Sequence, residues 1–470
     1  MKLGAFIAAL LVLGAVSLPA TAATETVIYN FQGGSDGGWP FSGVVRGADG
    51  ALYGTTYTGG DAVNCAGCGT VFKLSPPAAD GGAWTETVLH RFRGDEDGAF
   101  PMGGVLIDAD GALYGTTWGG GSSTGCSRGA GLQNNGCGTV FRLTPPSAGS
   151  SSWGYAVIHR FKAGNDGGLP GGTPVMDSSG TLYGTTFIGG NGLCTDSGWR
   201  GCGIVFSLTP RSGGGVAWKE RVLHRFADGE QGRWPGGLRL DSRGALFGTS
   251  SGAGRCNFGC GAVFKLTPPA PGLSTWKIQV LHRFYVGRLG ANPASLLIGD
   301  GGVLYGTTSS GGDSKRCQGN GCGTVFSLTP PTAGKTAWTL KILHRFSDRE
   351  PDGAYPTDLV MDASGSLFGT TTLGGGPPDP REPGNEGFTG GGIAYKLTPP
   401  GAGQDIWTQT VLHAFPGNDL DSIPDPSDGS GPRGALVPDG DGGFYGATQS
   451  GGSGSEGTNG GWGTVFKLTP

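Results

Sequence analysis

Short apolar stretches separated by Gly-rich turns run along the whole chain, and four of them recur in a fixed order. In the clearest copy, between Gly104 and Phe161, they read VLIDADG, LYGTT, GTVFRLTPP and VIHRF. Each stretch is rich in Val, Leu, Tyr, Phe and Thr and is bounded by Gly, Pro, Asp or Ser, which is typical of β-strands. One copy of the four stretches therefore predicts a four-stranded antiparallel sheet.

The LYGTT stretch occurs seven times, in slightly varied form, and sets the period of the repeat. Its copies start at Leu52, Leu113, Leu182, Leu246, Leu304, Leu367 and Phe444. The starts lie roughly 60–70 residues apart, a spacing that indicates an array of similar units. Because one small sheet cannot bury both of its faces, we expect the seven sheets to pack face to face around an axis.

The two ends of the chain carry complementary pieces of one unit. A copy of the fourth stretch, Val27–Phe31, precedes the first complete unit, and the last unit stops after its third stretch, Gly463–Leu468. Pairing these two segments closes a ring, whereas an open array leaves strand edges that favour aggregation. The sequence thus predicts an all-β fold, a seven-bladed β-propeller of four-stranded antiparallel blades that is closed by the N-terminal strand.

Composition supports short strands joined by tight turns. Of the 470 residues 99 are Gly, without the Gly-X-Y period of collagen. Gly supplies the positive φ angles that tight turns need. Only 14% of the residues are charged, the net charge is -4, and no run of Lys and Arg occurs, so we expect no nucleic-acid partner.

The N-terminal segment predicts export. Residues 1–23 combine a positive Lys2, an apolar stretch from Gly4 to Val16 and a small-residue cleavage site at Ala20-Thr21-Ala22, which is the pattern of a secretory signal peptide. No later stretch is apolar enough to span a membrane. We therefore expect one propeller domain over residues 24–470, secreted as a monomer to the periplasm or the extracellular space.

Ten cysteines fall in five pairs, each just before a GTVF-like stretch. The pairs are Cys65 and Cys68, Cys126 and Cys137, Cys194 and Cys202, Cys256 and Cys260, and Cys317 and Cys322. This placement favours local disulfides, in agreement with export. Zinc is the alternative, but a structural zinc site takes four ligands and each pair lies in a different repeat. We expect no metal and no cofactor.

All six histidines stand in one repeated slot, the His of VLHRF, and Tyr29 takes the seventh copy of that slot. They are His90, His159, His224, His282, His344 and His413. A repeated His among apolar neighbours on the outermost strand predicts a packed, hydrogen-bonded side chain. Catalysis or metal binding is the alternative, and no His remains elsewhere for a catalytic triad.

Two further repeated residues predict structural roles. The tryptophans that precede each fourth stretch predict wedges between sheets; they are Trp84, Trp153, Trp218, Trp276, Trp338 and Trp407. The Asp of the DG-x-x-P loops predicts a turn in which the carboxylate accepts hydrogen bonds from nearby backbone, with a calcium loop as the alternative. It recurs at Asp36, Asp97, Asp166 and Asp352.

Together, LYGTT-x-x-GG, GTVFKLTP, W-x-x-x-VLH-x-F and DG-x-x-P resemble the GloVer tandem-repeat ("choice-of-anchor") family of exported bacterial proteins. The resemblance covers roughly residues 24–470. It implies an extracellular repeat protein, often with a C-terminal anchoring signal. This sequence departs from that pattern, since it stops at Pro470 without such a tail. The family supplies no catalytic residues.

The loops between LYGTT and GTVF differ most among the copies, and in a propeller they emerge on the same face as the DG-x-x-P loops. Aromatic side chains stack on sugar rings, and Arg pairs with carboxylates. We therefore expect a binding module for an extracellular glycan or protein, with the alternative of a polysaccharide lyase or glycoside hydrolase in the funnel. The candidate ligand face comprises Trp199, Arg200, Arg255, Phe258, Lys315, Arg316 and Arg381.

Overall fold

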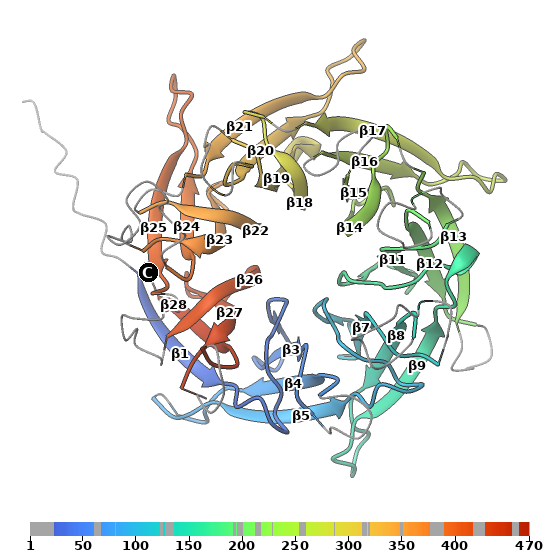
Figure 1. The fold of residues 1–470 in the computed structure, drawn as a ribbon, viewed down its shortest axis with the longest axis vertical. Coiled ribbons are helices and arrows are strands. Elements are labelled where there is room, and N and C mark those ends of the chain that lie inside the picture. Colours follow the sequence, from blue (N-terminus) through green and yellow to red (C-terminus); the bar gives the residue numbers. More distant parts are fainter. Residues whose placement is uncertain are drawn as a thin grey trace, which may run out of the picture.

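Seven four-stranded antiparallel sheets are arranged as blades around a central axis (Figure 1). The predicted seven-bladed β-propeller is therefore confirmed. The computed structural model describes residues 23–60, 67–79, 81–122, 126, 136–190, 194, 201–211, 218–227, 229–252, 260–285, 287–312, 317, 320–347, 351–376, 390–416, 428–453 and 460–469. Within these ranges, no helix is long and apolar enough to cross a membrane.

In the first three blades the innermost strand has only two residues. Blade 1 consists of β2 (Val45–Arg46), β3 (Leu52–Thr56), β4 (Thr70–Ser75) and β5 (Thr85–Arg91). Blade 2 consists of β6 (Leu106–Ile107), β7 (Leu113–Thr117), β8 (Thr139–Thr144) and β9 (Gly154–Arg160). A 3₁₀ turn, η1 (Gly164–Asp166), leads to blade 3, which consists of β10 (Val175–Met176), β11 (Leu182–Thr186), β12 (Ile204–Thr209) and β13 (Lys219–Arg225).

In the last four blades the innermost strand has 8 to 10 residues. Blade 4 consists of β14 (Arg233–Leu240), β15 (Leu246–Ser251), β16 (Gly261–Thr267) and β17 (Lys277–Phe284). Blade 5 consists of β18 (Ala291–Ile298), the turn η2 (Asp300–Gly302), β19 (Leu304–Ser310), β20 (Thr324–Thr329) and β21 (Thr339–Arg345). Blade 6 consists of β22 (Gly353–Met361), β23 (Leu367–Gly374), β24 (Ile393–Thr398) and β25 (Thr408–Ala414). Blade 7 consists of β26 (Gly429–Pro438), β27 (Phe444–Gly451), β28 (Thr464–Thr469) and β1 (Thr24–Asn30).

The N-terminal strand β1 closes the ring as the outermost strand of blade 7 (Figure 1). It pairs antiparallel with β28, with Val27 opposite Phe466 and Tyr29 opposite Val465. The Phe31 N–H continues the ladder by donating to the Gly463 carbonyl. The closing pair predicted from the sequence is therefore confirmed.

Within a blade, an aromatic ring of the third strand lies across the Gly of LYGTT in the second. Phe72 is fully buried, and a Cβ at Gly54 would lie 2.6 Å from Phe72 Cζ. In blade 2 the same distance, from Gly115 to Phe141, would be 2.4 Å. Neither distance leaves room for a side chain, so Gly at this position allows the ring to pack on the strand.

Between blades, the repeated Trp contacts the aromatic residue of the preceding blade's LYGTT stretch. The pairs are Trp84 with Tyr445, Trp153 with Tyr53, Trp218 with Tyr114, Trp276 with Tyr183, Trp338 with Phe247 and Trp407 with Tyr305. Their ring centroids lie 5.6 to 6.4 Å apart. The prediction that these tryptophans act as wedges is confirmed.

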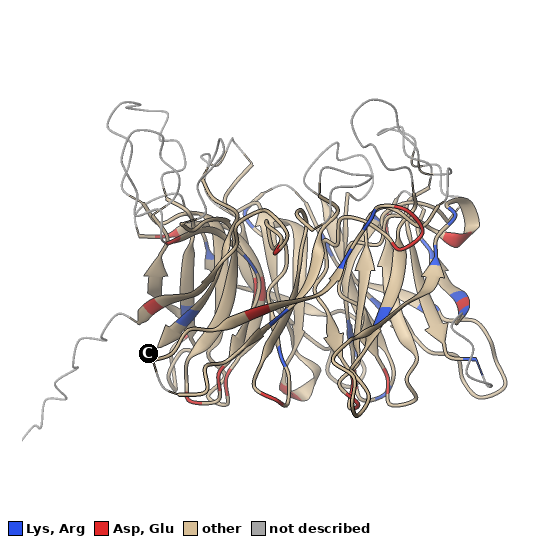
Figure 2. Ribbon diagram, turned by 90° about the horizontal axis from the view of Figure 1, so that it is seen from below, with Lys and Arg blue, Asp and Glu red and all other residues tan. Residues whose placement is uncertain are grey.

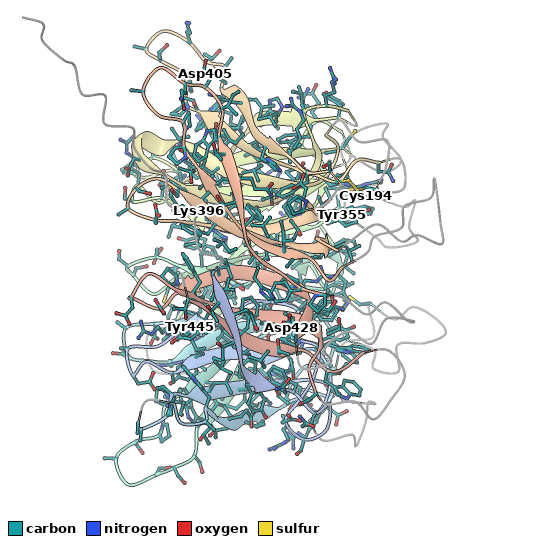
Figure 3. The ribbon with its side chains drawn as sticks, turned by 90° about the vertical axis from the view of Figure 1, so that its left-hand side faces the viewer. Cys194, Tyr355, Lys396, Asp405, Asp428 and Tyr445 are labelled. Atoms are coloured by element: carbon teal, nitrogen blue, oxygen red, sulfur yellow. A yellow bond between two sulfur atoms is a disulfide. The ribbon has the colours of Figure 1, made fainter. Side chains whose placement is uncertain are left out.

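The connections sort onto two faces of the disc. The turns between first and second strands and the links between third and fourth strands lie on one face, lower in Figure 2. At the other face, the segment before the first strand forms an antiparallel β-bridge with the segment after the second strand. Examples are the bridges of Gly38 with Thr58 and of Ala99 with Gly119. We call this second face the variable face. Tyr355 and Cys194 lie towards it, and Lys396 and Tyr445 lie towards the opposite face (Figure 3).

Candidate functional site

A cavity of about 500 Å³ lies at the centre of the ring, and residues of all seven blades line it. Much of its wall is backbone, because Gly stands at lining positions such as Gly103 and Gly172. Buried hydroxyl groups of the second strands hold this wall: Thr55 Oγ1 donates to the Gly103 carbonyl at 2.9 Å, and Thr116 Oγ1 to the Gly172 carbonyl at 3.0 Å. The wall is therefore fixed by contacts between blades.

One ring of residues on the variable face directly precedes the repeated Pro of each blade, and its member Tyr355 lines the cavity. Six of them have left-handed φ angles between 52° and 59° although they are not Gly: Trp39, Phe100, Leu169, Trp234, Asn292 and Tyr355. This conformation costs a residue with a side chain roughly 1–2 kcal/mol. Hydrogen bonds to the preceding blade oppose that cost, as when the Phe100 N–H donates to the Cys68 carbonyl and the Trp234 N–H to the Cys202 carbonyl, both at 2.8 Å. The direction of these side chains is thus set by the scaffold.

A second ring at the mouth follows each LYGTT stretch, and its chemistry changes around the propeller. Blades 1 to 3 carry aromatic residues there and blades 4 to 7 carry polar ones: Tyr57, Trp118, Phe187, Ser251, Ser309, Thr372 and Gln449. The candidate ligand face predicted from the sequence lies in the longer loops and does not include this change. The signal was present in the residue that follows each LYGTT copy.

Five aromatic residues of the two rings, together with Phe41, form what we call the aromatic arc: Phe41, Tyr57, Phe100, Trp118, Phe187 and Trp234. Tyr57 contacts both Phe41 and Phe100, at centroid distances of 4.8 and 5.2 Å. Phe187 contacts Trp118 at 5.4 Å and stacks on Trp234 at 5.0 Å with an interplanar angle of 10°. All six are partly exposed. The arc therefore offers apolar faces in two groups of contacting rings, one in blades 1 and 2 and one in blades 2 to 4.

The opposite side of the mouth is polar, and we call it the polar arc: Asn292, Ser309, Tyr355, Asp358, Thr372, Arg433 and Gln449. Arg239 Nη2 lies 3.6 Å from Asp358 Oδ1, an ion pair that joins blade 4 to blade 6. Arg433 Nε donates to Gln449 Oε1 at 2.9 Å. Burial raises the pKa of the Tyr57 and Tyr355 hydroxyls, so both remain neutral hydrogen-bonding groups.

The predicted ligand-face residues lie outside the described residues. This holds for Trp199, Arg200, Arg255, Phe258, Lys315, Arg316 and Arg381. The aromatic and polar residues at the cavity mouth come instead from positions next to the repeated Pro and after the LYGTT stretches.

Three of the predicted disulfides are formed, Cys126–Cys137, Cys194–Cys202 and Cys317–Cys322. Cys68 and Cys260 are also disulfide-bonded, while Cys65 and Cys256 lie outside the described residues. The local pairing predicted for these cysteines is confirmed for the three described pairs. Since the carbonyls of Cys68, Cys137, Cys202 and Cys322 accept hydrogen bonds from residues of the first ring, the disulfides also brace the cavity mouth.

Five of the repeated histidines lie beside a polar partner, as predicted, while the buried Nε2 of His282 has no hydrogen-bond partner among the described residues. His344 and His413 hydrogen bond to Asp352 and Asp428 at 3.2 and 3.1 Å, and His224 pairs with Gln231 at 2.8 Å. The Nε2 atoms of His90 and His159 lie 3.3 and 3.2 Å from the carboxylates of Asp97 and Asp166. In the seventh slot the Tyr29 hydroxyl donates to Asp36 at 3.1 Å. These groups lie on the outermost strands, away from the cavity.

The Asp residues also accept backbone hydrogen bonds, as predicted for a turn. The N–H of Gln32 donates to Asp36 at 2.9 Å, and the N–H of Lys162 donates to Asp166 at 2.7 Å. Each carboxylate therefore ties the loop between two blades to its own outer strand.

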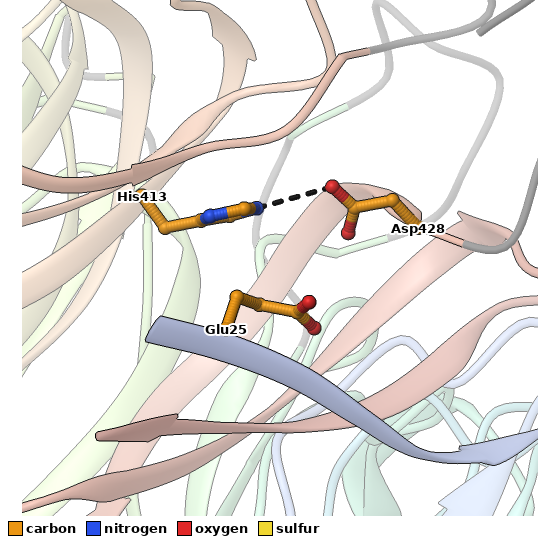
Figure 4. Close-up of side chains that lie close together, drawn as sticks. All are labelled: Glu25, His413 and Asp428. Carbon is orange, nitrogen blue, oxygen red and sulfur yellow. Dashed lines mark hydrogen bonds and ion pairs between the residues drawn. The ribbon is translucent and has the colours of Figure 1, made fainter. Parts of the chain in front are cut away.

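At the seam between blades 6 and 7, Glu25 joins His413 and Asp428 (Figure 4). Their potential ligand atoms lie within 4.8 Å of one another. Burial, and then the charge of Asp428, raise the pKa of Glu25 to about 7. Three ligands fall short of the four that a structural zinc site takes and of the six or more that calcium takes. The cluster is a variant of a contact that recurs at other seams, where Glu86 lies near Asp36 and Gln409 donates to Asp352 at 3.1 Å.

The comparisons with known proteins agree with the repeat and the fold. The profile of the Gloeobacter/Verrucomicrobia repeat matches residues 14–192, 125–377 and 192–458. No curated protein matches the chain.

Among solved structures, a fungal alcohol oxidase of the AA5 family in complex with copper is 13% identical, with 96% of this chain and 77% of that chain covered and a TM-score of 0.51. PorZ, a bacterial surface component of the type-IX secretion system of Porphyromonas gingivalis, is 15% identical. The match covers 94% of this chain and 48% of the PorZ chain, with a TM-score of 0.46. A gluconolactonase from Xanthomonas campestris is 12% identical, with 77% and 83% covered and a TM-score of 0.38. At these identities the likeness concerns the fold alone.

Proposed function

The chain belongs to the Gloeobacter/Verrucomicrobia repeat family, and we propose that it is an exported member that binds a glycan at the mouth of its central cavity. Export is supported by the signal-peptide pattern of residues 1–23 and by the disulfides, which form and persist in oxidising compartments.

The observation that carries the proposal is the division of the cavity mouth into an aromatic arc and a polar arc. A sugar ring has apolar C–H faces and a rim of hydroxyl groups. Aromatic faces such as Trp118 and Phe187 suit the C–H faces. Across the mouth, Asn292, Ser309 and Thr372 supply the donors and acceptors that hydroxyl groups need. Because backbone and inter-blade hydrogen bonds fix both arcs, binding requires little reorganisation.

A hydrolase in the funnel receives less support. Glycoside hydrolysis commonly uses a pair of carboxylates. The described lining of the cavity holds one, Asp358, which is already ion-paired with Arg239. We therefore favour binding without hydrolysis, and a test for released reducing sugar distinguishes the two.

The proposal is tested with the mature protein on a glycan array, followed by calorimetry on the bound glycans. Trp118→Ala and Phe187→Ala should each weaken binding at least about tenfold, a loss within the range expected when an aromatic anchor is truncated. Tyr285→Ala is the matched control, since Tyr285 is 58% exposed and follows an outermost strand, away from the cavity. Unchanged binding by Trp118→Ala and Phe187→Ala would place the ligand elsewhere, and no binding to any glycan would refute the proposal.

A further inference from the structure

The charges that line the central cavity do not balance. The described lining contains two cations, Arg239 and Arg433, and one carboxylate, that of Asp358. Arg239 is paired with Asp358. No carboxylate in the described part of the chain lies within ion-pair distance of Arg433, and its recorded polar contact is the neutral amide of Gln449. The cavity therefore presents one uncompensated positive charge.

Arg433 is held in place by its neighbours. Its Nε donates to Gln449 Oε1, and its guanidinium carbon lies 5.7 Å from the ring centroid of Phe41. The backbone beside it is fixed as well, because a Cβ at Gly434 would lie 1.9 Å from the Gly43 nitrogen. With Nε occupied, the two terminal nitrogens remain for a ligand. A guanidinium that is already oriented loses little conformational entropy when it binds.

The environment of Arg433 also favours an anionic partner. Burial lowers the pKa of Arg433, which means that its surroundings disfavour the charge that it carries. A partly buried charge without a counter-ion is costly, and an anion that reaches it removes much of that cost. The contact with Phe41 puts the guanidinium at one end of the aromatic arc.

We propose that Arg433 selects an acidic saccharide, whose carboxylate or sulfate group it binds through its two terminal nitrogens while a sugar ring of the same ligand lies on the aromatic arc. This inference rests on the proposed glycan site and specifies its ligand. Carboxylate and sulfate groups both present two oxygens to the planar fork of a guanidinium. Gln449 is the positioning residue, since it fixes the guanidinium without contacting the ligand.

The test compares charged and neutral forms of the same saccharide by calorimetry. Oligogalacturonate and its methyl ester form the carboxylate arm; sulfated dextran oligosaccharides and dextran form the sulfate arm. The wild-type protein should bind the charged member of at least one pair about tenfold or more tightly than the neutral one. Arg433→Gln should abolish this preference. Arg433→Lys keeps the charge without the fork and should retain part of the preference.

Arg243→Gln is the matched control, because it removes the same charge from an exposed turn on the opposite face. Near-ultraviolet circular dichroism checks the fold of each variant, and Arg433→Lys decides the question if Arg433→Gln does not fold. Equal binding of charged and neutral sugars by the wild type, or an unchanged preference in Arg433→Gln, would overturn the inference and leave the glycan site standing. Failure of every saccharide to bind would overturn both.

Discussion

The carboxylate of Glu25 lies beside that of Asp428 at the seam where the ring closes, and His413 hydrogen bonds to Asp428 from the third side (Figure 4). Glu25 Oε1 is buried and has no hydrogen-bond partner among the described residues. At the equivalent place in the preceding seam, the amide of Gln409 donates to Asp352. When the Glu25 carboxyl group is protonated, it can act as a hydrogen-bond donor towards Asp428, as the Gln409 amide does towards Asp352.

The free energy of unfolding should therefore depend on the protonation of Glu25. Its pKa rises from 4.5 to about 7 on folding, so its contribution to stability is complete below about pH 4.5 and is lost as the pH rises through about 7. Glu25→Gln should be more stable than the wild type above about pH 7, by about 1–2 kcal/mol after allowance for partial exposure. Below about pH 4.5 the difference should vanish. Denaturant unfolding at several pH values measures it, with the exposed Glu96→Gln as the control; a constant difference at all pH values would contradict this account.

Replacing a glutamine by glutamate should make the free energy of unfolding depend on pH at another seam as well. Gln409→Glu replaces the donor to Asp352 with a second carboxylate. We expect a loss of about 1–2 kcal/mol near pH 8 that shrinks as the pH falls and the new carboxyl group is protonated. Gln409→Leu, which removes the hydrogen bond without adding charge, separates the lost donor from the repulsion. If both variants lose the same stability at every pH, repulsion plays no part.

His282 should be the histidine that is easiest to replace. Its Nε2 is buried without a hydrogen-bond partner among the described residues, and burial lowers its pKa from 6.5. The folded state therefore resists its protonation, and stability should fall as the pH drops below about 6.5. His282→Phe should remove that fall and leave stability at about pH 8 nearly unchanged. His413→Phe, which removes one of the hydrogen-bond donors to Asp428, should cost about 1–3 kcal/mol at the same pH. Equal losses for the two variants would argue against distinct roles.

The wall of the cavity should depend on the threonines of the second strands. Thr55 is 1% exposed and donates to the Gly103 carbonyl in the next blade. Thr55→Val keeps the shape but leaves that carbonyl without its donor, at a cost of about 1–3 kcal/mol. Thr55→Ser keeps the hydroxyl and should cost less. A melting curve for each variant is sufficient, and a Val variant as stable as the wild type would mean that water replaces the hydroxyl.

Loss of one disulfide should loosen the mouth as well as lower stability. Cys126 and Cys137 are separated by 11 positions, and a closed loop of this size contributes about 2–3 kcal/mol at most. The Cys137 carbonyl accepts the hydrogen bond from the left-handed Leu169 at 2.7 Å. In the double variant Cys126→Ser/Cys137→Ser, the Leu169 amide should exchange with solvent faster than in the wild type. An unchanged exchange rate there, with lower overall stability, would confine the effect of the disulfide to its own loop.

The repeat made the fold predictable from the sequence. Each LYGTT copy keeps the Gly that the neighbouring Phe covers, as Gly54 does beneath Phe72, and a pattern needed for packing recurs as often as the blade does. The spare fourth stretch, Val27–Phe31, then identified the closing strand. Both inferences needed only local sequence and the geometry of a ring.

The site was less predictable, because it depends on differences among similar copies. Trp118 and Ser309 occupy the same repeated position in blades 2 and 5, yet only the structure places that position at the cavity mouth. Similar motifs also form first strands of different length, 2 residues in β6 and 8 in β18. The contact of Glu25 with Asp428 was hidden for another reason, since it joins residues at opposite ends of the chain.

The position of β1 imposes an order on folding. Blades 1 to 6 are each built from one continuous stretch of chain and can form as soon as that stretch has emerged. Blade 7 cannot, because its outermost strand, β1, precedes all the other described strands in the chain and its partner, β28, follows them all. Until β28 has been made, β1 therefore keeps both of its edges exposed, and exposed strand edges promote aggregation in unfinished β-proteins. The pairing that completes blade 7 therefore leaves its precursor vulnerable until β28 has been made.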